Sequence, residues 1–183
     1  MKQRSDFELL NTARVNVKSF DCGKKPINDY LHKYADKNMG LGLSVTFILP
    51  YKKADDAADA KHRVAAFYTL ANQTLSPETI PTEKKLPRYQ APVVLVAQLD
   101  VNKSHQGQGL GIRTLITALL HAYSVSTAPN AIPSLGVVVD AIDDDAYNFY
   151  MAMDFFIPFA GIPLKLFVPM ESISQLADVY FNS

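Results

Sequence analysis

The stretch of residues 93–123 constrains the fold most strongly. It begins with an apolar run, residues 93–97, which continues through Leu99 and Val101 and is typical of a buried strand. Its middle, residues 106–111, is rich in glycine, which permits positive φ and the close approach of a ligand to the backbone. It ends in apolar residues at helical spacing: Ile112, Leu115, Ile116, Leu119, Leu120 and Tyr123. The remaining faces of this amphipathic helix carry Arg113, Thr114, Thr117 and His121.

A strand, a glycine-rich turn and a helix in this order predict an anion-binding cradle, because free N–H groups and the helix dipole converge where the helix begins. A Walker-type loop would end in Gly-Lys-Ser/Thr, whereas Gly111 is followed by Ile112. A dinucleotide fingerprint counted from Gly107 would need a glycine at Ile112, and no acidic residue follows before Asp140. The remaining pattern is Q-x-x-G-x-G, formed by Gln106, Gly109 and Gly111. The structural alternative is a glycine-rich turn that binds nothing.

Length and composition exclude several classes of protein. With 183 residues, 48% hydrophobic and 20% charged, the sequence predicts a globular protein with a single domain over residues 1–183. No apolar run approaches the roughly 20 residues of a membrane helix. Charges throughout residues 1–20 argue against a secretory signal. A single cysteine excludes an internal disulfide and fits a cytoplasmic location.

The charge is balanced overall but uneven along the chain. Residues 1–40 carry eight Lys/Arg and five Asp/Glu, a net charge of +3, whereas residues 101–183 carry three and seven, a net charge of −4. A neutral chain is not a general nucleic-acid binder, so any contact with nucleic acid would depend on a local basic patch.

The N-terminal half predicts one helix and two strands. Residues 7–17 are weakly patterned and predict a lead-in strand or an irregular edge, and Pro26 is then placed for the first turn of a helix. The predicted buried face of this helix comprises Ile27, Tyr30, Leu31, Tyr34 and Ala35. Strands follow at residues 44–50 and 63–72, joined by an exposed loop. Four prolines within residues 74–92 predict a long irregular connection, a type of loop that is often functional.

The C-terminal half predicts strands at residues 135–139 and 164–169, with a helix between them and another after them. Three carboxylates, residues 143–145, favour the start of the first helix because the helix dipole is positive there. The apolar face of this helix comprises Ala146, Phe149, Tyr150 and Met153. The predicted fold is α/β (α+β), with a mixed, partly antiparallel central sheet flanked by helices.

The Q-x-x-G-x-G loop resembles the acetyl-CoA pyrophosphate loop of GNAT-family N-acetyltransferases, and the resemblance extends over nearly the whole chain. Within that family the sequence is most similar to the toxins of type II toxin–antitoxin modules, which acetylate aminoacyl-tRNA. The residues that carry this narrower resemblance are Phe20-Asp21-Cys22-Gly23, Ile27-Asn28-Asp29-Tyr30-Leu31, Ala66-Phe67-Tyr68-Thr69-Leu70-Ala71, Pro92-Val93-Val94-Leu95, Leu99-Asp100-Val101, Asp144-Asp145-Ala146, Phe149-Tyr150 and residues 164–169. Two positions depart from the toxin pattern: Gln98 replaces a usual arginine and Asp154 a usual glycine.

The resemblance implies an N-acetyltransferase with acetyl-CoA as its cofactor and no metal. It implies that cofactor contacts come from Leu99, Asp100, Val101, Gln106, Gly107, Gln108, Gly109, Leu110, Gly111 and Ile112. The loop would hold the pyrophosphate, and a backbone N–H at the end of the strand would stabilise the developing oxyanion. Tyr150 is placed by the resemblance as the general acid that protonates the leaving thiolate. Spacing alone would place Tyr150 in the core.

The acceptor is expected to be the α-amino group of an aminoacyl-tRNA, with a ribbon-helix-helix antitoxin and a second copy of the chain as further partners. Cations expected to contact tRNA are Lys84, Lys85, Arg88, Lys33 and Lys37. Two alternatives stay open: a GNAT enzyme that acetylates a small-molecule or protein amine, and an acyl-CoA-binding module without turnover. Cys22 has no histidine placed to activate it, so we expect it to be a packed turn residue rather than a nucleophile.

Overall fold

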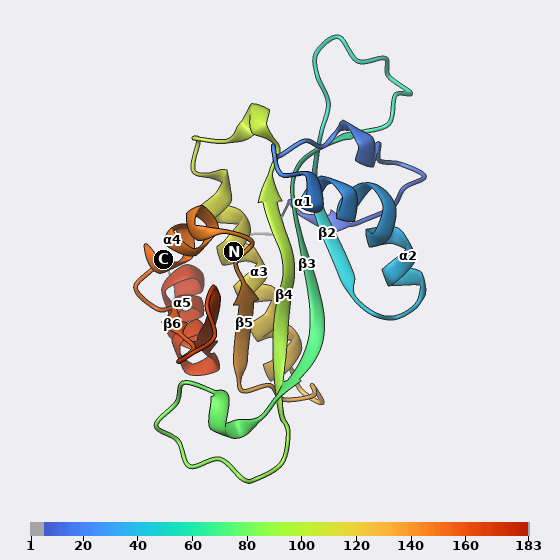
Figure 1. The fold of residues 1–183 in the computed structure, drawn as a ribbon. Helices are drawn as coiled ribbons and strands as arrows, with labels where there is room; N and C mark the ends of the chain where they lie inside the picture. The colour runs from blue at the N-terminus through green and yellow to red at the C-terminus, as the bar shows by residue number, and fades with distance from the viewer. Residues whose placement is uncertain (1–5, 183) are drawn as a thin grey trace. The chain divides into compact units, whose positions relative to one another are not determined.

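The computed structural model describes residues 6–182, and the chain divides into two compact units (Figure 1). Unit 1 comprises Met1–Ala71 and Gln98–Ala118. Its elements are β1 (Glu8–Leu9), η1 (Val17–Ser19), α1 (Lys25–Asp29), η2 (Tyr30–Tyr34), α2 (Ala35–Gly40), β2 (Val45–Tyr51), most of β3 (Arg63–Leu75), the end of β4 (Ala91–Val101), η4 (Lys103–His105) and the first half of α3 (Leu110–Thr127).

Unit 2 comprises Asn72–Ala97 and Leu119–Ser183. It contains the remaining parts of β3, β4 and α3, together with η3 (Pro77–Thr79), β5 (Gly136–Asp140), α4 (Asp144–Met151), β6 (Ile157–Pro158), β7 (Lys165–Pro169) and α5 (Met170–Asn182). Among the described residues, no helix is long and apolar enough to cross a membrane.

The strands form a sheet in the order β1-β2-β3-β4-β5-β7-β6. The β1/β2, β2/β3, β5/β7 and β6/β7 pairs are antiparallel, whereas β4 and β5 run parallel, with Val94 opposite Val137. The sheet is therefore mixed and partly antiparallel, and helices flank it, which confirms the predicted fold class. The two-residue strand β6 was not predicted, because so short a run carries no alternating pattern.

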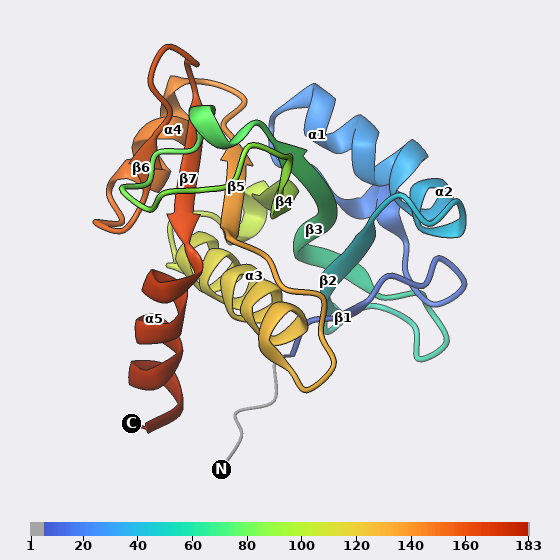
Figure 2. The same cartoon turned by 90° about the horizontal axis from the view of Figure 1, so that it is seen from below.

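In unit 1, α1 and α2 cover one face of β2 and β3 (Figure 2). Residues from both layers form its core, including Leu31 and Ala35 from the helical side and Ile48 and Val64 from the strands. Pro26 lies in the first turn of α1, as predicted, where its missing N–H costs no hydrogen bond.

The predicted buried face of this helix was wrong at Tyr34, whose side chain is 51% exposed. The cause is a turn of π-helix at η2, which holds one more residue than an α-turn and rotates the positions after it. Ile27, Leu31 and Ala35 are buried, but Tyr34 faces solvent. A simple 3.6-residue period cannot anticipate such a turn.

The predicted buried stripe of α3 was also displaced. Thr114, which had been placed on an outer face, is fully buried, whereas Ile112 is 41% exposed. The stripe that packs inward consists of small and branched residues: Thr114, Leu115, Ala118, Leu119, Ala122 and Ser126. Burial of Thr114 is possible because its hydroxyl donates to the Leu110 carbonyl at 2.7 Å.

Unit 2 has a core that contains Val93, Val138, Phe159 and Phe167. The predicted acidic start of α4 is confirmed, since Asp143 is the N-cap and its Oδ1 accepts from the Ala146 N–H at 2.8 Å. Helix α5 follows β7 directly, as the sequence pattern predicted (Figure 2).

Candidate functional site

The glycine loop of unit 1 lies between η4 and α3, with Gln106 to Gly109 exposed to solvent. Gly107 and Gly109 have φ values of +73° and +76°, a region that side chains disfavour. A Cβ at either position would point into open space, with no atom within 4 Å. The two glycines are therefore required by the shape of the backbone and not by packing against protein.

Helix α3 begins at Leu110, immediately after this loop. The Arg113 N–H donates to the Gly109 carbonyl at 3.2 Å, which closes the first helical turn. The N–H groups of Leu110, Gly111 and Ile112 come before that bond, and a helix start offers them no acceptor within the helix. The backbone of the loop and this helix start therefore have N–H groups that an anion could accept from, and the binding of an anion here stays a prediction.

The Gln106 side chain fixes the base of the loop. Its Nε2 donates to the Cys22 carbonyl at 3.1 Å and to the Val101 carbonyl at 2.9 Å. Both side-chain donors are thus used inside the protein. Gln106 contributes its side chain to the position of the loop, and only its backbone N–H remains as a donor to an anion.

Asn102 is buried, and its hydrogen bonds join several segments of unit 1 next to the loop. Its Nδ2 donates to the carbonyls of Ser19 and Val64, both at 3.1 Å, and its Oδ1 accepts from the Ser104 N–H at 3.2 Å. The Asn102 N–H donates to the Ala65 carbonyl at 2.8 Å. Asn102 was not predicted as part of the site, although an amide directly after a strand and before a glycine loop is a recognisable signal for a cap.

The turn at residues 20–23 supports the loop from the other side. Asp21 forms an ion pair with Lys103, and its Oδ1 accepts from the Gly23 N–H at 2.9 Å and from Asn28 Nδ2 at 2.8 Å. The hydrogen bond from Lys103, followed by those from Gly23 and Asn28, lowers the pKa of Asp21 to about 2. The motif residues of the turn therefore position the loop.

Cys22 is a buried part of this turn. Its Sγ lies 3.3 Å from Asn28 Oδ1, and desolvation raises the pKa of the thiol to about 11. A thiol with so high a pKa is almost entirely protonated near neutral pH and is therefore a poor nucleophile. This agrees with the expectation of a packed turn residue.

The family resemblance implies that the oxyanion donor lies at the end of β4. Leu99 and Asp100 are half-buried and Val101 is buried. The Val101 N–H donates to Asp100 Oδ1 at 2.8 Å, so this N–H is engaged while that contact lasts.

Tyr150 lies in unit 2, near the end of α4, and its side chain is only 7% exposed. Its ring packs against Phe149, with centroids 5.4 Å apart, and against Phe156, with centroids 5.3 Å apart. These two aromatic rings restrict its orientation. This burial agrees with the helical spacing of the apolar residues, which by itself predicted that Tyr150 lies in the core.

The cations expected to meet tRNA divide between the two units. Lys33 and Lys37 belong to the helical layer of unit 1, and the Lys33 ammonium lies 2.8 Å from the Asp29 carboxylate. Lys84, Lys85 and Arg88 are exposed on the long connection of unit 2, where Lys84 forms an ion pair with Glu171. Exposed ion pairs of this kind contribute little to stability and can exchange for phosphate contacts.

The charge of the chain also divides between the units. Unit 1 carries fourteen Lys/Arg and nine Asp/Glu, a net charge of +5, and unit 2 carries four and nine, a net charge of −5. The formal charge of zero therefore conceals one basic and one acidic unit. The excess of cations that a nucleic-acid contact would need lies in unit 1.

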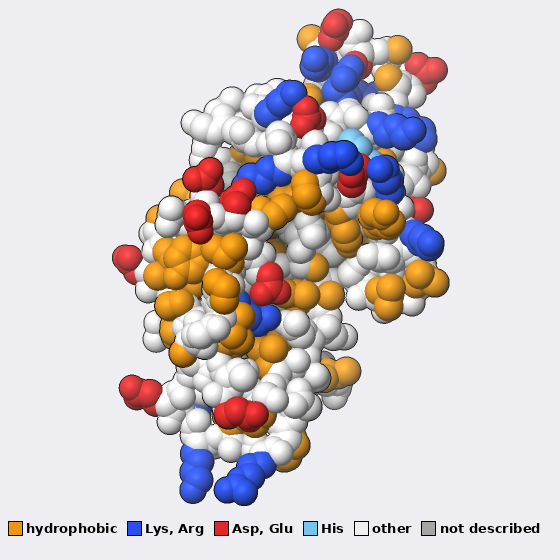
Figure 3. All heavy atoms as spheres, viewed as in Figure 1, with side chains coloured by type: hydrophobic (Ala, Val, Ile, Leu, Met, Phe, Trp, Pro, Cys, Tyr) orange, Lys and Arg blue, Asp and Glu red, His pale blue; other side chains and the backbone are white. Residues whose placement is uncertain are grey.

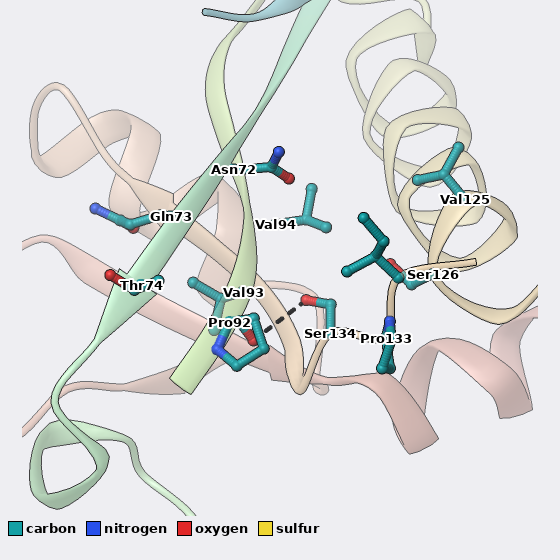
Figure 4. Close-up of a pocket in the computed structure, with 11 residues that line it drawn as sticks. Asn72, Gln73, Thr74, Pro92, Val93, Val94, Val125, Ser126, Pro133 and Ser134 are labelled. Atoms are coloured by element: carbon teal, nitrogen blue, oxygen red, sulfur yellow. Dashed lines mark hydrogen bonds between the residues drawn. The ribbon is translucent and has the colours of Figure 1, made fainter. Parts of the chain in front are cut away.

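A pocket in unit 2 is lined by none of the residues predicted for the site (Figure 4). Its walls include Asn72 from β3, Val94 from β4 and Val125 from α3, and Pro133 and Ser134 close one end (Figure 4). Among residues 6–182, no group of three or more His, Cys, Asp or Glu side chains could hold a metal ion.

The comparisons with known proteins agree with this geometry. No protein-family model matches the sequence. A tRNA-acetylating toxin of Mycobacterium tuberculosis is 31% identical over 163 residues, which span 88% of this chain and 90% of that protein. The AtaT toxin complexed with acetyl-methionyl-tRNAfMet is a structural neighbour with a TM-score of 0.80 and 27% identity, over 93% of this chain and 98% of AtaT.

Two further structures give the same result. AtaTR bound with acetyl-CoA has a TM-score of 0.77 and 27% identity, over 93% of this chain and 96% of that one. A tyrosine-to-phenylalanine variant of AtaT, bound to the C-terminus of the antitoxin AtaR, has a TM-score of 0.75 and 25% identity, over 93% and 95% of the two chains.

The fold and the glycine loop define a GNAT-type acyltransferase. The chain belongs to the GNAT-family N-acetyltransferases, in the group of the tRNA-acetylating toxins. The family resemblance stated from the sequence is confirmed.

Proposed function

We propose that this protein transfers an acetyl group from acetyl-CoA to the α-amino group of an aminoacyl-tRNA and thereby blocks translation as the toxin of a toxin–antitoxin module. The observation that carries this proposal is the similarity over 88% of the chain to a tRNA-acetylating toxin. AtaT complexed with acetyl-methionyl-tRNAfMet and AtaTR bound with acetyl-CoA support the same acceptor and donor.

The residues of the glycine loop fit the cofactor. Gly107 and Gly109 leave open the space that a Cβ would fill, and the backbone around them is exposed. The N–H groups from Gln106 to Ile112, at the positive end of α3, would hold the pyrophosphate. When bound, acetyl-CoA supplies an acetyl group activated as a thioester.

The chain's own residues would assist the transfer at two points. A backbone N–H at the end of β4, within Leu99–Val101, would stabilise negative charge on the carbonyl oxygen as the amine nitrogen attacks the carbon. As the C–N bond forms and the C–S bond breaks, the Tyr150 hydroxyl would give a proton to the departing sulfur. An α-amino group has a pKa of about 7.7–8.0, so a neutral fraction is present near neutral pH without a dedicated base.

The phosphates of tRNA would meet cations in both units. Lys33 and Lys37 supply them in unit 1, and Lys84, Lys85 and Arg88 supply them in unit 2. We also propose a cytoplasmic location, since the substrate is found there, and a ribbon-helix-helix antitoxin as partner. The structure of AtaT with the C-terminus of AtaR supports an antitoxin, and a homodimer is a further proposal.

The test is induced expression followed by mass spectrometry of cellular tRNA, with a Gly109→Glu variant as the inactive control. We expect growth arrest and N-acetylated aminoacyl-tRNA with the wild type, and neither with the variant. Acetyl-CoA turnover on small amines with unmodified tRNA would instead identify a small-molecule acetyltransferase. Binding of acetyl-CoA without release of thiol on any amine would identify a non-catalytic module.

A further inference from the structure

The long connection between β3 and β4 concentrates the positive charge of unit 2. That unit has a net charge of −5, yet three of its four Lys and Arg residues, Lys84, Lys85 and Arg88, lie within five positions of the sequence. Figure 3 shows Lys and Arg side chains that project into solvent where this connection lies, at the lower end of the view. Residues 84–90 contain no carboxylate, so this segment offers its cations to an anionic partner.

An exposed aromatic ring follows these cations directly. The side chain of Tyr89 is 71% exposed. In the part of the chain that the structure describes, the side chains of Lys85, Arg88 and Tyr89 form no hydrogen bond, ion pair or ring contact. Lys84, in contrast, is engaged in its ion pair with Glu171. The segment therefore presents two unpaired cations and one uncovered ring.

The connection is held in one shape by contacts with the core of unit 2. Ile80 is buried in that core, and Leu86 packs against it. Gln90 Nε2 donates to Ser76 Oγ at 3.2 Å, which joins the two ends of the connection. Three prolines within residues 77–87 fix further backbone φ angles. A segment that is already ordered loses little conformational entropy when a ligand binds.

The chemistry of this segment favours a nucleotide over a protein surface. Leu86 is half-buried against the core, so Pro87 and Tyr89 are the exposed apolar side chains of residues 84–90. The centre of a protein interface is more apolar than these two side chains can make it. An unpaired nucleotide needs only a ring on which its base can stack and cations for the neighbouring phosphates. A duplex would present its phosphates but no free base face, because its bases stack on one another.

We propose that residues 84–89 bind one unpaired nucleotide of RNA, with its base stacked on Tyr89 and the adjoining phosphates on Lys85 and Arg88. The proposal deepens the proposed function and rests on it for the source of the RNA, which is an unpaired nucleotide of the tRNA, at its 3′ end or in one of its loops. It adds a residue that contacts a base to the cations assigned to phosphates, and it implies a preference for single-stranded over duplex RNA.

The first measurement is the binding of a single-stranded RNA of about ten nucleotides, within the range of known single-strand sites, alone or annealed to its complement. Fluorescence anisotropy at several salt concentrations gives the affinity and its salt dependence. The proteins are the wild type, Tyr89→Ala, Tyr89→Phe and Arg88→Ala. Tyr180→Ala is the matched control, since Tyr180 is a 40% exposed tyrosine of the same unit that lies on α5, outside the segment.

Tyr89→Ala should weaken single-strand binding by about tenfold or more, because base stacking on the ring is lost, and it should leave the salt dependence unchanged. Tyr89→Phe keeps a ring and should bind as the wild type does, as should Tyr180→Ala. Arg88→Ala should instead reduce the slope of log K against log salt by roughly 0.7, the value for one phosphate contact on a single strand. Duplex binding should respond to Arg88→Ala and not to Tyr89→Ala.

A tRNA that carries 2-aminopurine at the 3′ end or in a loop identifies the nucleotide. The fluorescence of 2-aminopurine falls when the base stacks on an aromatic ring. At the position that Tyr89 contacts, the wild type and Tyr89→Phe should quench the fluorescence, and Tyr89→Ala should not.

Two results would overturn the inference. One is single-strand binding by Tyr89→Ala equal to that of the wild type, which would leave the ring as a contact for a protein partner. The other is an equal loss of single-strand and duplex binding in Tyr89→Ala. Acetylation of aminoacyl-tRNA by the same preparations separates this inference from the proposed function. Acetylation together with either of these results would overturn the nucleotide site alone, whereas Tyr89-dependent binding without any acetylation would support the site and overturn the proposed function.

Discussion

The side-chain amide of Gln106 donates to the carbonyl of Cys22 at 3.1 Å, and so ties the glycine loop to a turn 84 positions earlier in the chain. The same amide donates to the Val101 carbonyl at the end of β4. One side chain thus fixes the loop relative to both the turn and the strand of unit 1.

Gln106→Ala should therefore weaken acetyl-CoA binding while the fold persists. Two hydrogen bonds of about 0.5–1.5 kcal/mol each are lost, and the loop must then be ordered when the ligand binds, so we expect Kd to rise roughly tenfold. Gln108→Ala is the matched control, because Gln108 is exposed in the same loop and its Kd should stay within about twofold. Isothermal titration calorimetry measures both, and equal affinities would contradict the anchoring role.

A bulky anion at Gly109 should abolish acetyl-CoA binding. The backbone φ of +76° disfavours any side chain, and a carboxylate there would occupy the open space and repel the pyrophosphate. Gly42→Glu is the control, since Gly42 has a φ of +70°, equally open space and a place in the α2–β2 connection. Calorimetry on folded Gly109→Glu should detect no binding, and an unchanged affinity would remove the loop from the site.

Tyr150→Phe should reduce turnover by roughly 10²–10⁴-fold with acetyl-CoA affinity nearly intact, because general acid catalysis is lost and the ring remains. A tyrosine with only a packing role would behave differently: its hydroxyl would contribute about 0.5–1.5 kcal/mol to stability, and turnover would be preserved. Melting temperature and turnover measured on one preparation separate the two. Tyr123→Phe, which loses a hydroxyl 3.2 Å from Ser174, should keep full turnover.

Salt and charge should both weaken tRNA binding. If Lys84 and Lys85 contact phosphates, the combined Lys84→Glu and Lys85→Glu variant should bind more weakly, and the slope of log K against log salt should fall in magnitude by roughly one per contact. Glu171→Gln separates the lost ion pair from the lost phosphate contact, because it frees Lys84 without adding negative charge. Filter binding at several salt concentrations measures the slope, and a flat dependence would favour a small-molecule acceptor.

Gly136→Ala should destabilise unit 2. A Cβ at this position would lie 2.2 Å from the Val168 carbonyl oxygen and 2.7 Å from the Phe167 ring, and the paired strands β5 and β7 leave little room to move. We expect a loss of roughly 1–3 kcal/mol in the free energy of unfolding. Gly40→Ala, in open space at the end of α2, should instead gain about 0.5–1 kcal/mol. Urea denaturation tests both, and equal stabilities would contradict the contact.

Patterns within a few residues predicted the structure well. The apolar run of β4, Pro26 at the start of α1 and the cap at Asp143 each depend on neighbours in the sequence, and each was found as expected. The glycine loop was predicted for the same reason, since its spelling and its backbone conformation are both local.

The failures have causes that a local pattern does not contain. Tyr34 is exposed because one helical turn is wider than the rest, and Thr114 is buried because its hydroxyl is satisfied inside the helix. The link from Gln106 to Cys22 joins segments far apart in the sequence. The spacing of the glycines identified the loop residues. It could not show which of them position the loop and which are available to a ligand.

The division of charge into +5 and −5 has a practical consequence for how the protein behaves with polyelectrolytes. A sequence pI of about 6.9 suggests a protein that neither resin of an ion-exchange experiment retains at neutral pH. At low ionic strength, salt screens little of the attraction between an excess charge and a nearby resin of opposite charge. We therefore expect the basic unit to retain the protein on heparin and the acidic unit to retain it on a quaternary amine. One unit is basic and the other is acidic, so the net charge of the whole chain is a poor guide to its partners.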